Sequence, residues 1–448
     1  MGSLAKGRTR DMTTGNVFQN ILMFAIPLFI SNFFQQCYNI CDTMIASHNL
    51  GEHALAAIGL TGSISGLIIG FANGMNNGYG IIIARSFGAQ NEKKIKEAVA
   101  WDVVLNLSLS VLLTAVTLLF TKPMLQLIQT PADIFPEAEV YIRVVLSGIT
   151  ATLFYNMESG ILRAVGNSRT PLYFLIFSCS INIMMDLIFV RVLHLGVAGI
   201  ALATVFAQII CSILCLIHIL RRYHFLIPGR GDFVFQPELI SEMLTTGFSM
   251  GMMNSIFQIG SVMLQGAINT LGTDIIAAHT AARRVVMIGN MPLSSIASAN
   301  ATFVSQNYGA RKSERIREGI KKSIGLDVIW LAIYIAGVLI FSDKLIYALT
   351  GSRSAVILDN ARMNLRINML LFPPLGVLLI LRTSLQGLGH RILPLISSSL
   401  ELIIKGVAAF IFVPLWGYFG ASIAEPSTWL ICMLFLLVSF VKVMKKES

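Results

Sequence analysis

Charge is what this sequence lacks most. Only 12% of its 448 residues are Asp, Glu, Lys or Arg, whereas a soluble globular protein carries about a quarter. With 55% hydrophobic residues, the chain has too little polar surface to be a soluble enzyme that merely contains a few buried helices. The sequence therefore predicts a multi-pass integral membrane protein of the cell membrane, surrounded by the lipid bilayer.

The sequence also lacks the usual signs of metal binding and catalysis. Its six cysteines lie in apolar stretches without CxxC spacing or a neighbouring histidine, and no HExxH sequence occurs. Zinc sites generally need such patterns. His279 has no convincing partner for a catalytic role. We therefore expect neither an enzyme nor a resident metal or cofactor.

The net charge of +10 lies mostly in the segments that connect the apolar stretches. This placement argues against a nucleic-acid partner. Lysines and arginines gather before the first stretch, in every second connection and after the last stretch. They include Lys6, Arg8, Arg10, Arg311, Lys312 and Lys445. Because cytoplasmic loops are enriched in Lys and Arg, both termini are predicted to be cytoplasmic.

Twelve apolar stretches are long enough to cross a bilayer, which takes about 20 residues in a helix. Backbone groups in lipid must be hydrogen-bonded within the protein, and the runs of Ile and Val do not alternate as strands would, so we expect an all-α protein. The predicted transmembrane helices span residues 18–48, 53–83, 97–120, 136–161, 171–192, 196–221, 240–270, 274–304, 319–341, 357–386, 392–416 and 419–441.

The second half of the chain repeats the first. One displacement pairs Leu50-Gly51 with Leu271-Gly272 and Gly88-Ala89 with Gly309-Ala310, and a nearly equal one pairs Gly166 with Gly389 and Pro171 with Pro394. Because each half holds an even number of helices, both run the same way through the membrane, as in transporters with parallel repeats. We expect an N-lobe over residues 1–221, a cytoplasmic linker over 222–238 and a C-lobe over 239–448, with a central cavity between the parallel six-helix lobes.

Polar side chains within the apolar stretches mark the candidate site. A carboxylate at the bilayer centre costs roughly 2.5 to 3.5 kcal/mol on insertion scales, so Asp42 and Asp186 need a reason to be there. Two neighbouring acids in a low dielectric cannot easily both stay charged, so one should hold a proton or bind a cation. We predict that Asp42, Asn182, Asp186 and Thr204 couple transport to H⁺ or Na⁺. The alternative is that these side chains only hydrogen-bond across helices.

Uncharged polar residues are candidates for a substrate cavity. They lie on the first, second and seventh predicted helices, and comprise Gln35, Asn39, Asn73, Asn76, Asn254 and Gln258. The spacing of those on the first and seventh helices gives each helix one polar face. Such a face either lines a wet cavity or packs against a neighbouring helix, and both interpretations stay open.

The second half carries a different set of polar residues. Met263 and Ala409 stand where the first half has its two acids, so we expect the acid pair to serve one lobe only. Glu401 and Lys405 are one helical turn apart and are predicted to neutralise each other. His279 is either a satisfied side chain or a proton relay.

Several stretches resemble one family of membrane proteins. They are FAIPLFISNFFQQCYNICDTMIASHNLGEHALAAIG (residues 24–59), LRAVGNSRTP (162–171), SINIMMDLIFV (180–190), GVAGIALAT (196–204) and SQNYGARKSERI (305–316). In this combination the sequence resembles the multidrug and toxic compound extrusion (MATE) family over essentially its whole length. It looks most similar to the branch of the DNA-damage-inducible protein F.

The resemblance implies an antiporter that exports organic cations or other amphipathic drugs in exchange for H⁺ or Na⁺. In that branch an acid on helix one, an Asn and an Asp on helix five and a Thr on helix six form the coupling site, and Asp42, Asn182, Asp186 and Thr204 match them. The alternative is a flippase for lipid-linked precursors, although acids favour cations. A single chain with two lobes suffices as a monomer, so the expected partners are small amphipathic molecules and the bilayer.

The sequence departs from the family pattern in the second half. Other members carry a coupling Glu on the seventh transmembrane helix, where this chain has Phe257 and Gln258. They also carry an Asp on the tenth transmembrane helix (residues 357–386 here), which has no equivalent in this chain. Ala46 also replaces a glycine that often follows the helix-one acid. These departures put a cation site in the C-lobe in doubt.

Overall fold

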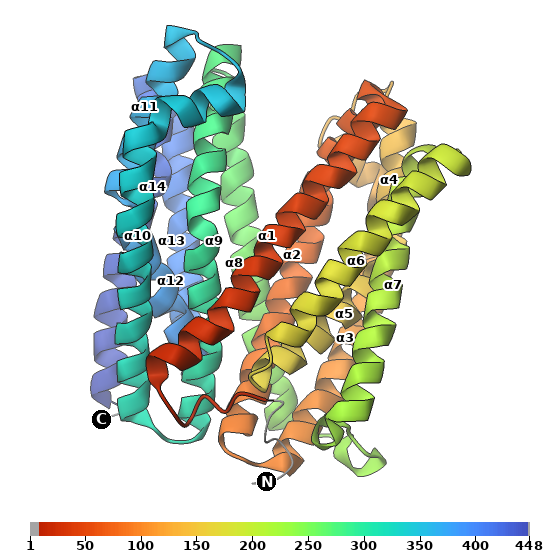
Figure 1. The fold of residues 1–448 in the computed structure, drawn as a ribbon, viewed down its shortest axis with the longest axis vertical. Helices are drawn as coiled ribbons and strands as arrows, with labels where there is room; N and C mark the ends of the chain where they lie inside the picture. Colours follow the sequence, from red (N-terminus) through yellow and green to blue (C-terminus); the bar gives the residue numbers. More distant parts are fainter. Residues whose placement is uncertain (1–8, 447–448) are drawn as a thin grey trace. The chain divides into compact units, whose positions relative to one another are not determined.

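The computed structural model describes residues 9–446, so Lys6 and Arg8 of the topology prediction lie outside the described residues. All regular secondary structure in residues 9–446 is helical, which confirms the all-α prediction (Figure 1). The cytoplasmic placement of both termini and the central cavity stay predictions.

The first half of the chain forms six helical rods. They are α1 (Val17–Leu50), α2 (Glu52–Gly88), α3 (Glu92–Leu127), α4 (Phe135–Ser147) joined to α5 (Ile149–Ala164), α6 (Arg169–Leu187) continued by the π-helix η1 (Ile188–Val192), and α7 (Gly196–Arg222). The α4 and α5 axes are bent by 44°. Two 3₁₀ turns, η2 (His224–Leu226) and η3 (Arg230–Asp232), follow α7. A Cβ at Gly148, between α4 and α5, would clash with Val205, so glycine at the bend lets α7 pack closely.

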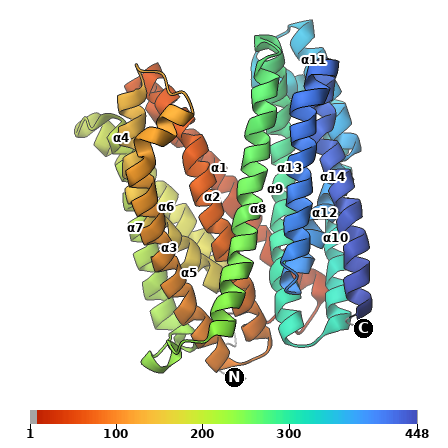
Figure 2. The same cartoon turned by 180° about the vertical axis from the view of Figure 1, so that it is seen from behind.

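The second half repeats this order. Its rods are α8 (Pro237–Asn269), α9 (Thr273–Gly309), α10 (Ser313–Thr350), α11 (Ala355–Leu370) joined to α12 (Phe372–Gly387), α13 (Ile392–Val407) continued by the π-helix η4 (Ala408–Phe412), and α14 (Val413–Lys446). The α11 and α12 axes are bent by 48°. Within α14, Gly417 has non-helical backbone angles (φ 57°, ψ −137°), so the kink at this glycine, rather than the start of α14, divides the last two rods. Figure 2 shows the same helices from behind.

Hydropathy alone finds fewer spans than the fold contains. Seven of the described helices are long and apolar enough to cross a membrane, or nine if each bent pair is one span. Polar residues keep α8 and α9 out of that count, and residues 392–445 enter it once although Gly417 divides them. With these helices included, the rods agree with the twelve-helix prediction.

The backbone supports the internal repeat independently of side-chain identity. Gly51 (φ 86°) and its counterpart Gly272 (φ 99°) both have positive φ angles, as do Gly166 (φ 85°) and Gly389 (φ 88°). Such angles are easily reached only by glycine. Each half also has a π-helical segment in its fifth rod. The two halves therefore share turns and helix irregularities as well as helix order.

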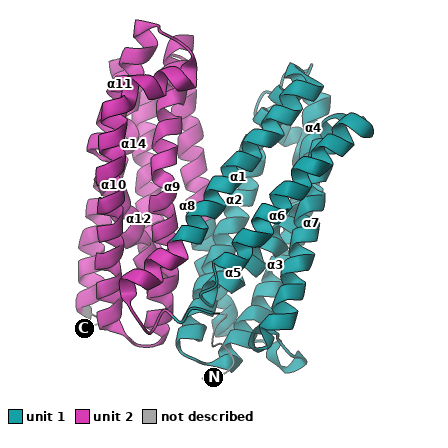
Figure 3. Cartoon of the chain, viewed as in Figure 1, with its two compact units in different colours: residues 1–11, 26–251 teal, residues 12–25, 252–448 magenta. Residues whose placement is uncertain are grey.

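The rods form two compact units, which do not coincide with the halves of the chain (Figure 3). Of the described residues, unit 1 contains 9–11 and Ile26–Gly251, and unit 2 contains Met12–Ala25 and 252–446. Helix α1 therefore begins in unit 2 and continues in unit 1, and α8 begins in unit 1 and continues in unit 2. Unit 1 therefore includes the first turns of α8, and unit 2 includes the first turns of α1.

Within unit 1, α2 and the start of α8 meet through glycines. A Cβ at Gly74 would lie 2.6 Å from the Gly251 Cα, and one at Gly78 would lie 2.6 Å from the Gly247 Cα. Small residues spaced in this way let transmembrane helices pack closely.

The same α8 segment reads GFSMG, which formally matches the GxSxG motif of serine hydrolases. It lies inside a continuous helix rather than on a strand-to-helix turn, so it does not have the geometry of a nucleophile elbow.

In unit 2, the SQNYGARKSERI stretch holds the segment that precedes α1. The Met12 amide donates to Gln306 Oε1 at 3.0 Å, and Asn307 Nδ2 donates to the Met12 carbonyl at 3.1 Å. Lys312 Nζ donates to the Thr13 carbonyl at 2.8 Å. The segment before α1 is thereby fixed to the last turn of α9 and to the loop that follows it, which gives these polar residues a structural role.

Candidate functional site

The residues predicted for ion coupling lie together in unit 1. Helix α6 packs along α7 (Figure 1), and their polar side chains meet where Asn182 Nδ2 donates to Thr204 Oγ1 at 3.4 Å. Helix α1 joins them through Tyr38, whose hydroxyl donates to Thr204 Oγ1 at 3.1 Å. Thr204 in turn donates to the Ile200 carbonyl at 3.1 Å within its own helix. The hydroxyl of Thr204 is therefore a junction of three helices.

The two acids face each other beside this junction. The carboxyl groups of Asp42 on α1 and Asp186 on α6 lie within hydrogen-bonding reach of one another. Asp186 and Asn182 are fully buried. Within the described part of the chain, neither oxygen of Asp186 meets a hydrogen-bond donor. A proton on one carboxyl would satisfy both groups by bridging them, and a small cation between two carboxylates would do the same.

The acids lie next to an apolar contact and a helix irregularity. Ala46, Val190 and Ile200 form a small buried cluster that joins α1, η1 and α7. The π-helical segment η1 begins two residues after Asp186, and π-bulges frequently occur at functional sites. Ala46 is fully buried in this cluster, so its methyl group is part of the packing around the acids.

Two aromatic residues of the site were not predicted. Tyr38 precedes Asp42 by four residues, so it shares the polar face of α1, and this spacing could have pointed to it. Tyr141 on α4 interacts electrostatically with both Asp42 and Asp186. The sequence gives no comparable signal for Tyr141, because it belongs to a helix with no other residue of the site.

The predicted cavity residues have different environments within unit 1. Gln35 and Asn39 are exposed on α1. On α2, Asn73 Oδ1 accepts a hydrogen bond from Asn156 Nδ2 of α5 at 2.7 Å. Asn76 is buried, and its Nδ2 donates to the Leu153 carbonyl at 3.4 Å. The contacts of Asn73 and Asn76 favour the helix-packing interpretation, whereas the exposure of Gln35 and Asn39 suits a cavity lining.

The polar face predicted on the seventh helix lies on the part of α8 that belongs to unit 2. Asn254 is exposed and Gln258 is half-buried. Farther along the helix, Ser261 is buried, and Gln265 Nε2 donates to Asn269 Oδ1 at 2.9 Å. The face is therefore polar over its whole length but open to solvent or lipid only in part. Its role in binding substrate stays a prediction.

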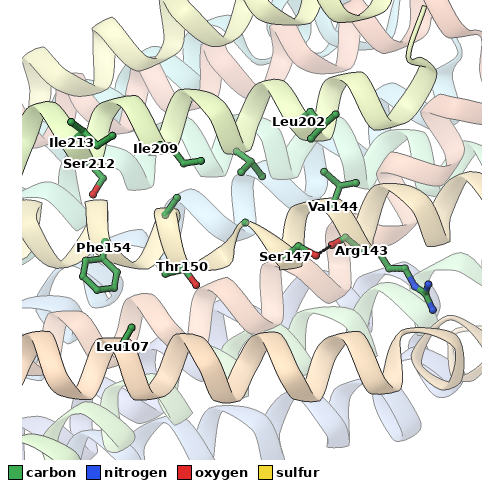
Figure 4. Close-up of a pocket in the computed structure, with 13 residues that line it drawn as sticks. Leu107, Arg143, Val144, Ser147, Thr150, Phe154, Leu202, Ile209, Ser212 and Ile213 are labelled. Atoms are coloured by element: carbon green, nitrogen blue, oxygen red, sulfur yellow. Dashed lines mark hydrogen bonds between the residues drawn. The ribbon is translucent and has the colours of Figure 1, made fainter.

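Unit 1 also contains an apolar pocket that none of the predicted site residues lines. It has a volume of about 720 Å³ and lies between α3, α4, α5 and α7 (Figure 4). Leu107, Phe154 and Ile209 contribute to its walls, with Arg143 at one end and Ser212 at the other. Because its walls are mostly aliphatic and aromatic, the pocket offers no charge pair for ion coupling.

Comparison with known proteins agrees with this architecture. The MatE family model matches residues 27–188 and 247–411, one match in each half. The chain is 27% identical to "Probable multidrug resistance protein YpnP" of Bacillus subtilis, with 68% of each chain covered. It is 24% identical to "Multidrug export protein MepA" of Staphylococcus saprophyticus, with 85% of each covered.

Solved structures match over nearly the full length. "Crystal structure of MATE in complex with MaL6" has a TM-score of 0.91 and 24% identity, with 99% of both chains covered. An outward-facing structure described as a "multidrug resistance MATE family transporter" has the same TM-score and identity, and covers 100% of this chain and 99% of that chain. At this identity the structures establish the shared fold, and the family match extends over both repeats. The chain therefore belongs to the MatE family of multidrug efflux transporters.

Proposed function

We propose that this transporter exports organic cations or other amphipathic molecules in exchange for H⁺ or Na⁺. The single observation that carries the proposal is the facing pair of Asp42 and Asp186 within one unit. Both acids lie on helices that would cross the bilayer. Acidic residues inside a membrane are costly, and they usually mark ion or proton pathways.

The proposed coupling follows from electrostatics. With a proton or Na⁺ between the two carboxyls, α1 and α6 are held together. When both groups are ionised, two unit charges about 4 Å apart repel by about 4 kcal/mol at an effective dielectric constant of about 20. A cationic substrate relieves this repulsion, as does the coupling ion. The two ligands therefore compete for the same negative charge, and binding of one favours release of the other.

Competition drives transport only if affinity differs between the inward-open and outward-open states. A ligand that binds both states equally shifts no equilibrium. Two contacts join α1 to α7 beside the acids: the hydrogen bond from the Tyr38 hydroxyl to Thr204 and the apolar contact of Ala46. These contacts could respond to whether an ion is bound between the carboxyls. We propose that the charge on the acids changes how α1 packs on α6 and α7.

The test uses purified protein in liposomes, with export of ethidium followed by fluorescence. A proton gradient and a sodium gradient are imposed separately. The proposal requires that at least one of them accumulates ethidium against its concentration gradient. Equilibration without accumulation would indicate a passive channel, and flipping of a lipid-linked precursor without ethidium transport would indicate a flippase.

A further inference from the structure

Unit 2 buries an ammonium group inside its helix bundle. The side chain of Lys405 on α13 is only 1% exposed, although lysine is rarely fully buried. Its Nζ lies 4.4 Å from the centre of the Phe257 ring on α8, within cation–π range. A Cβ at Gly260 of α8 would approach the Lys405 Cδ to 2.9 Å, so glycine makes room for the aliphatic stem.

Two carboxylates from different helices lie within ion-pair distance of the ammonium. Lys405 Nζ lies 3.1 Å from Glu401 Oε1 on its own helix and 3.7 Å from Glu425 Oε1 on α14. The first contact agrees with the predicted pairing of Glu401 with Lys405. Glu401 also pairs with Arg382 of α12 at 3.4 Å. Glu425 is thus the carboxylate that depends most on Lys405, and its side chain is 24% exposed.

Other titratable groups surround the same pair. On α9, Arg283 and His279 act electrostatically on Glu425, with less effect than Lys405. Tyr418 contacts the His279 ring with its hydroxyl 3.4 Å from Nδ1, and Cys432 lies near Arg382, Glu401 and Lys405. Among the described residues, Lys405 is nevertheless the only cation within ion-pair distance of both carboxylates.

The internal repeat places this lysine at a particular position. The displacement that pairs Gly166 with Gly389 and Pro171 with Pro394 also pairs Asn182 with Lys405. Lys405 therefore occupies the place in unit 2 that Asn182 occupies beside the acids of unit 1. The groups that contact its ammonium come from α8, α13 and α14, the counterparts of α1, α6 and α7.

We propose that the Lys405 ammonium is a covalently held cation that takes the place, in unit 2, of the exchangeable cation bound by unit 1. On this view the cluster of Glu401 and Glu425 in unit 2 binds no exchangeable H⁺ or Na⁺, because its counter-ion is part of the chain. Removing the ammonium turns the space beside Glu425 into a site for a small monovalent cation or a proton.

A purely stabilising role explains these contacts less well. Replacing a buried ion pair with apolar residues of similar size is often neutral or stabilising, because the pair must first lose its hydration. In this cluster the cost of burial falls on a lysine, two glutamates and an arginine from three helices. A tethered counter-ion gives a reason to keep the charges. It also agrees with a difference between the two halves, since unit 2 has Ala409 where unit 1 has Asp186.

The inference rests on the proposed coupling role of unit 1, but its test measures binding rather than transport. The Asp42→Asn/Asp186→Asn double variant removes the unit 1 acids while Lys405 stays intact. Binding of radioactive sodium to purified protein is measured alongside the infrared C=O band of protonated carboxyl groups. In this background we expect no sodium binding that depends on Glu425. Such binding would overturn the proposal, because unit 2 would then hold an exchangeable cation beside its lysine.

The second arm adds Lys405→Met to the same background. We expect a gain of about one sodium ion or one protonated carboxyl per protein, since a half-buried carboxylate that loses its partner takes up a counter-ion or a proton. Adding Glu425→Gln should abolish the gain, and Lys405→Arg should never show it, because arginine keeps the charge. A folded methionine variant with neither gain would refute the proposal.

A second substitution covers the case in which methionine prevents folding. Lys405→Asn introduces the residue that the first half carries at this position, and the same gain is expected. Failure of ethidium export in the unmodified protein would count against the proposed function of unit 1. The two binding measurements do not depend on export, so they would still support or refute the proposal that Lys405 is the tethered cation of unit 2.

Discussion

The contact between α2 and α8 in unit 1 gives a prediction with a magnitude that follows from geometry. In Gly78→Ala, the added Cβ would lie 2.6 Å from the Gly247 Cα and 2.7 Å from its nitrogen. Carbon atoms normally approach to about 3.5–4.0 Å, so the helices must separate locally by about 1 Å. Backbone atoms cannot rotate away as a flexible side chain would. We expect a loss of stability of about 1–3 kcal/mol, the usual cost of overpacking.

The matched control lies on the same helix. A Cβ at Gly62 of α2 meets nothing within 4 Å, so Gly62→Ala should keep or raise stability, by up to about 1 kcal/mol from helix propensity. The assay is thermal unfolding of both purified variants in one detergent. Equal midpoints for Gly78→Ala and Gly62→Ala would refute the close glycine packing of α2 on α8.

Three further substitutions test individual contacts. Asn156→Ala leaves Asn73 without its 2.7 Å partner and should lower stability by about 1–3 kcal/mol, whereas an unchanged midpoint would show that the two helices do not depend on this bond. Tyr38→Phe removes the hydroxyl that binds Thr204, so ion-driven export should weaken while the protein stays folded; full export would exclude this contact from coupling. Asp327→Asn alters a buried acid of unit 2 whose oxygens meet no donor among the described residues; because the proposed coupling site lies in unit 1, export should persist, and its loss would extend coupling to unit 2.

Much of the fold was predictable because it depends on repeated local signals. The length of the apolar stretches gave the helices, and the paired glycines at 51 and 272 and at 166 and 389 gave the repeat. The exchange of first turns between units was not predictable, since α1 and α8 are each unbroken in sequence. The π-helical segments likewise leave no pattern in a stretch that is apolar throughout.

The candidate site was only partly predictable. Spacing along one helix identified Asn182 with Asp186, and the cost of burying a carboxylate drew attention to Asp42. Contacts between distant helices were missed, such as Tyr141 beside the acids and Glu425 beside Lys405. Polarity alone also could not distinguish a cavity residue from a packing residue, as the buried Asn76 shows.

The most direct test of the central claim is ion-driven ethidium export by Asp42→Asn and Asp186→Asn, compared with the unmodified protein in liposomes. Each substitution keeps the size of the side chain but removes one ionisable carboxyl from the pair. The account predicts that both variants reconstitute normally and lose accumulation driven by the proton or sodium gradient. Undiminished accumulation by both variants would contradict it.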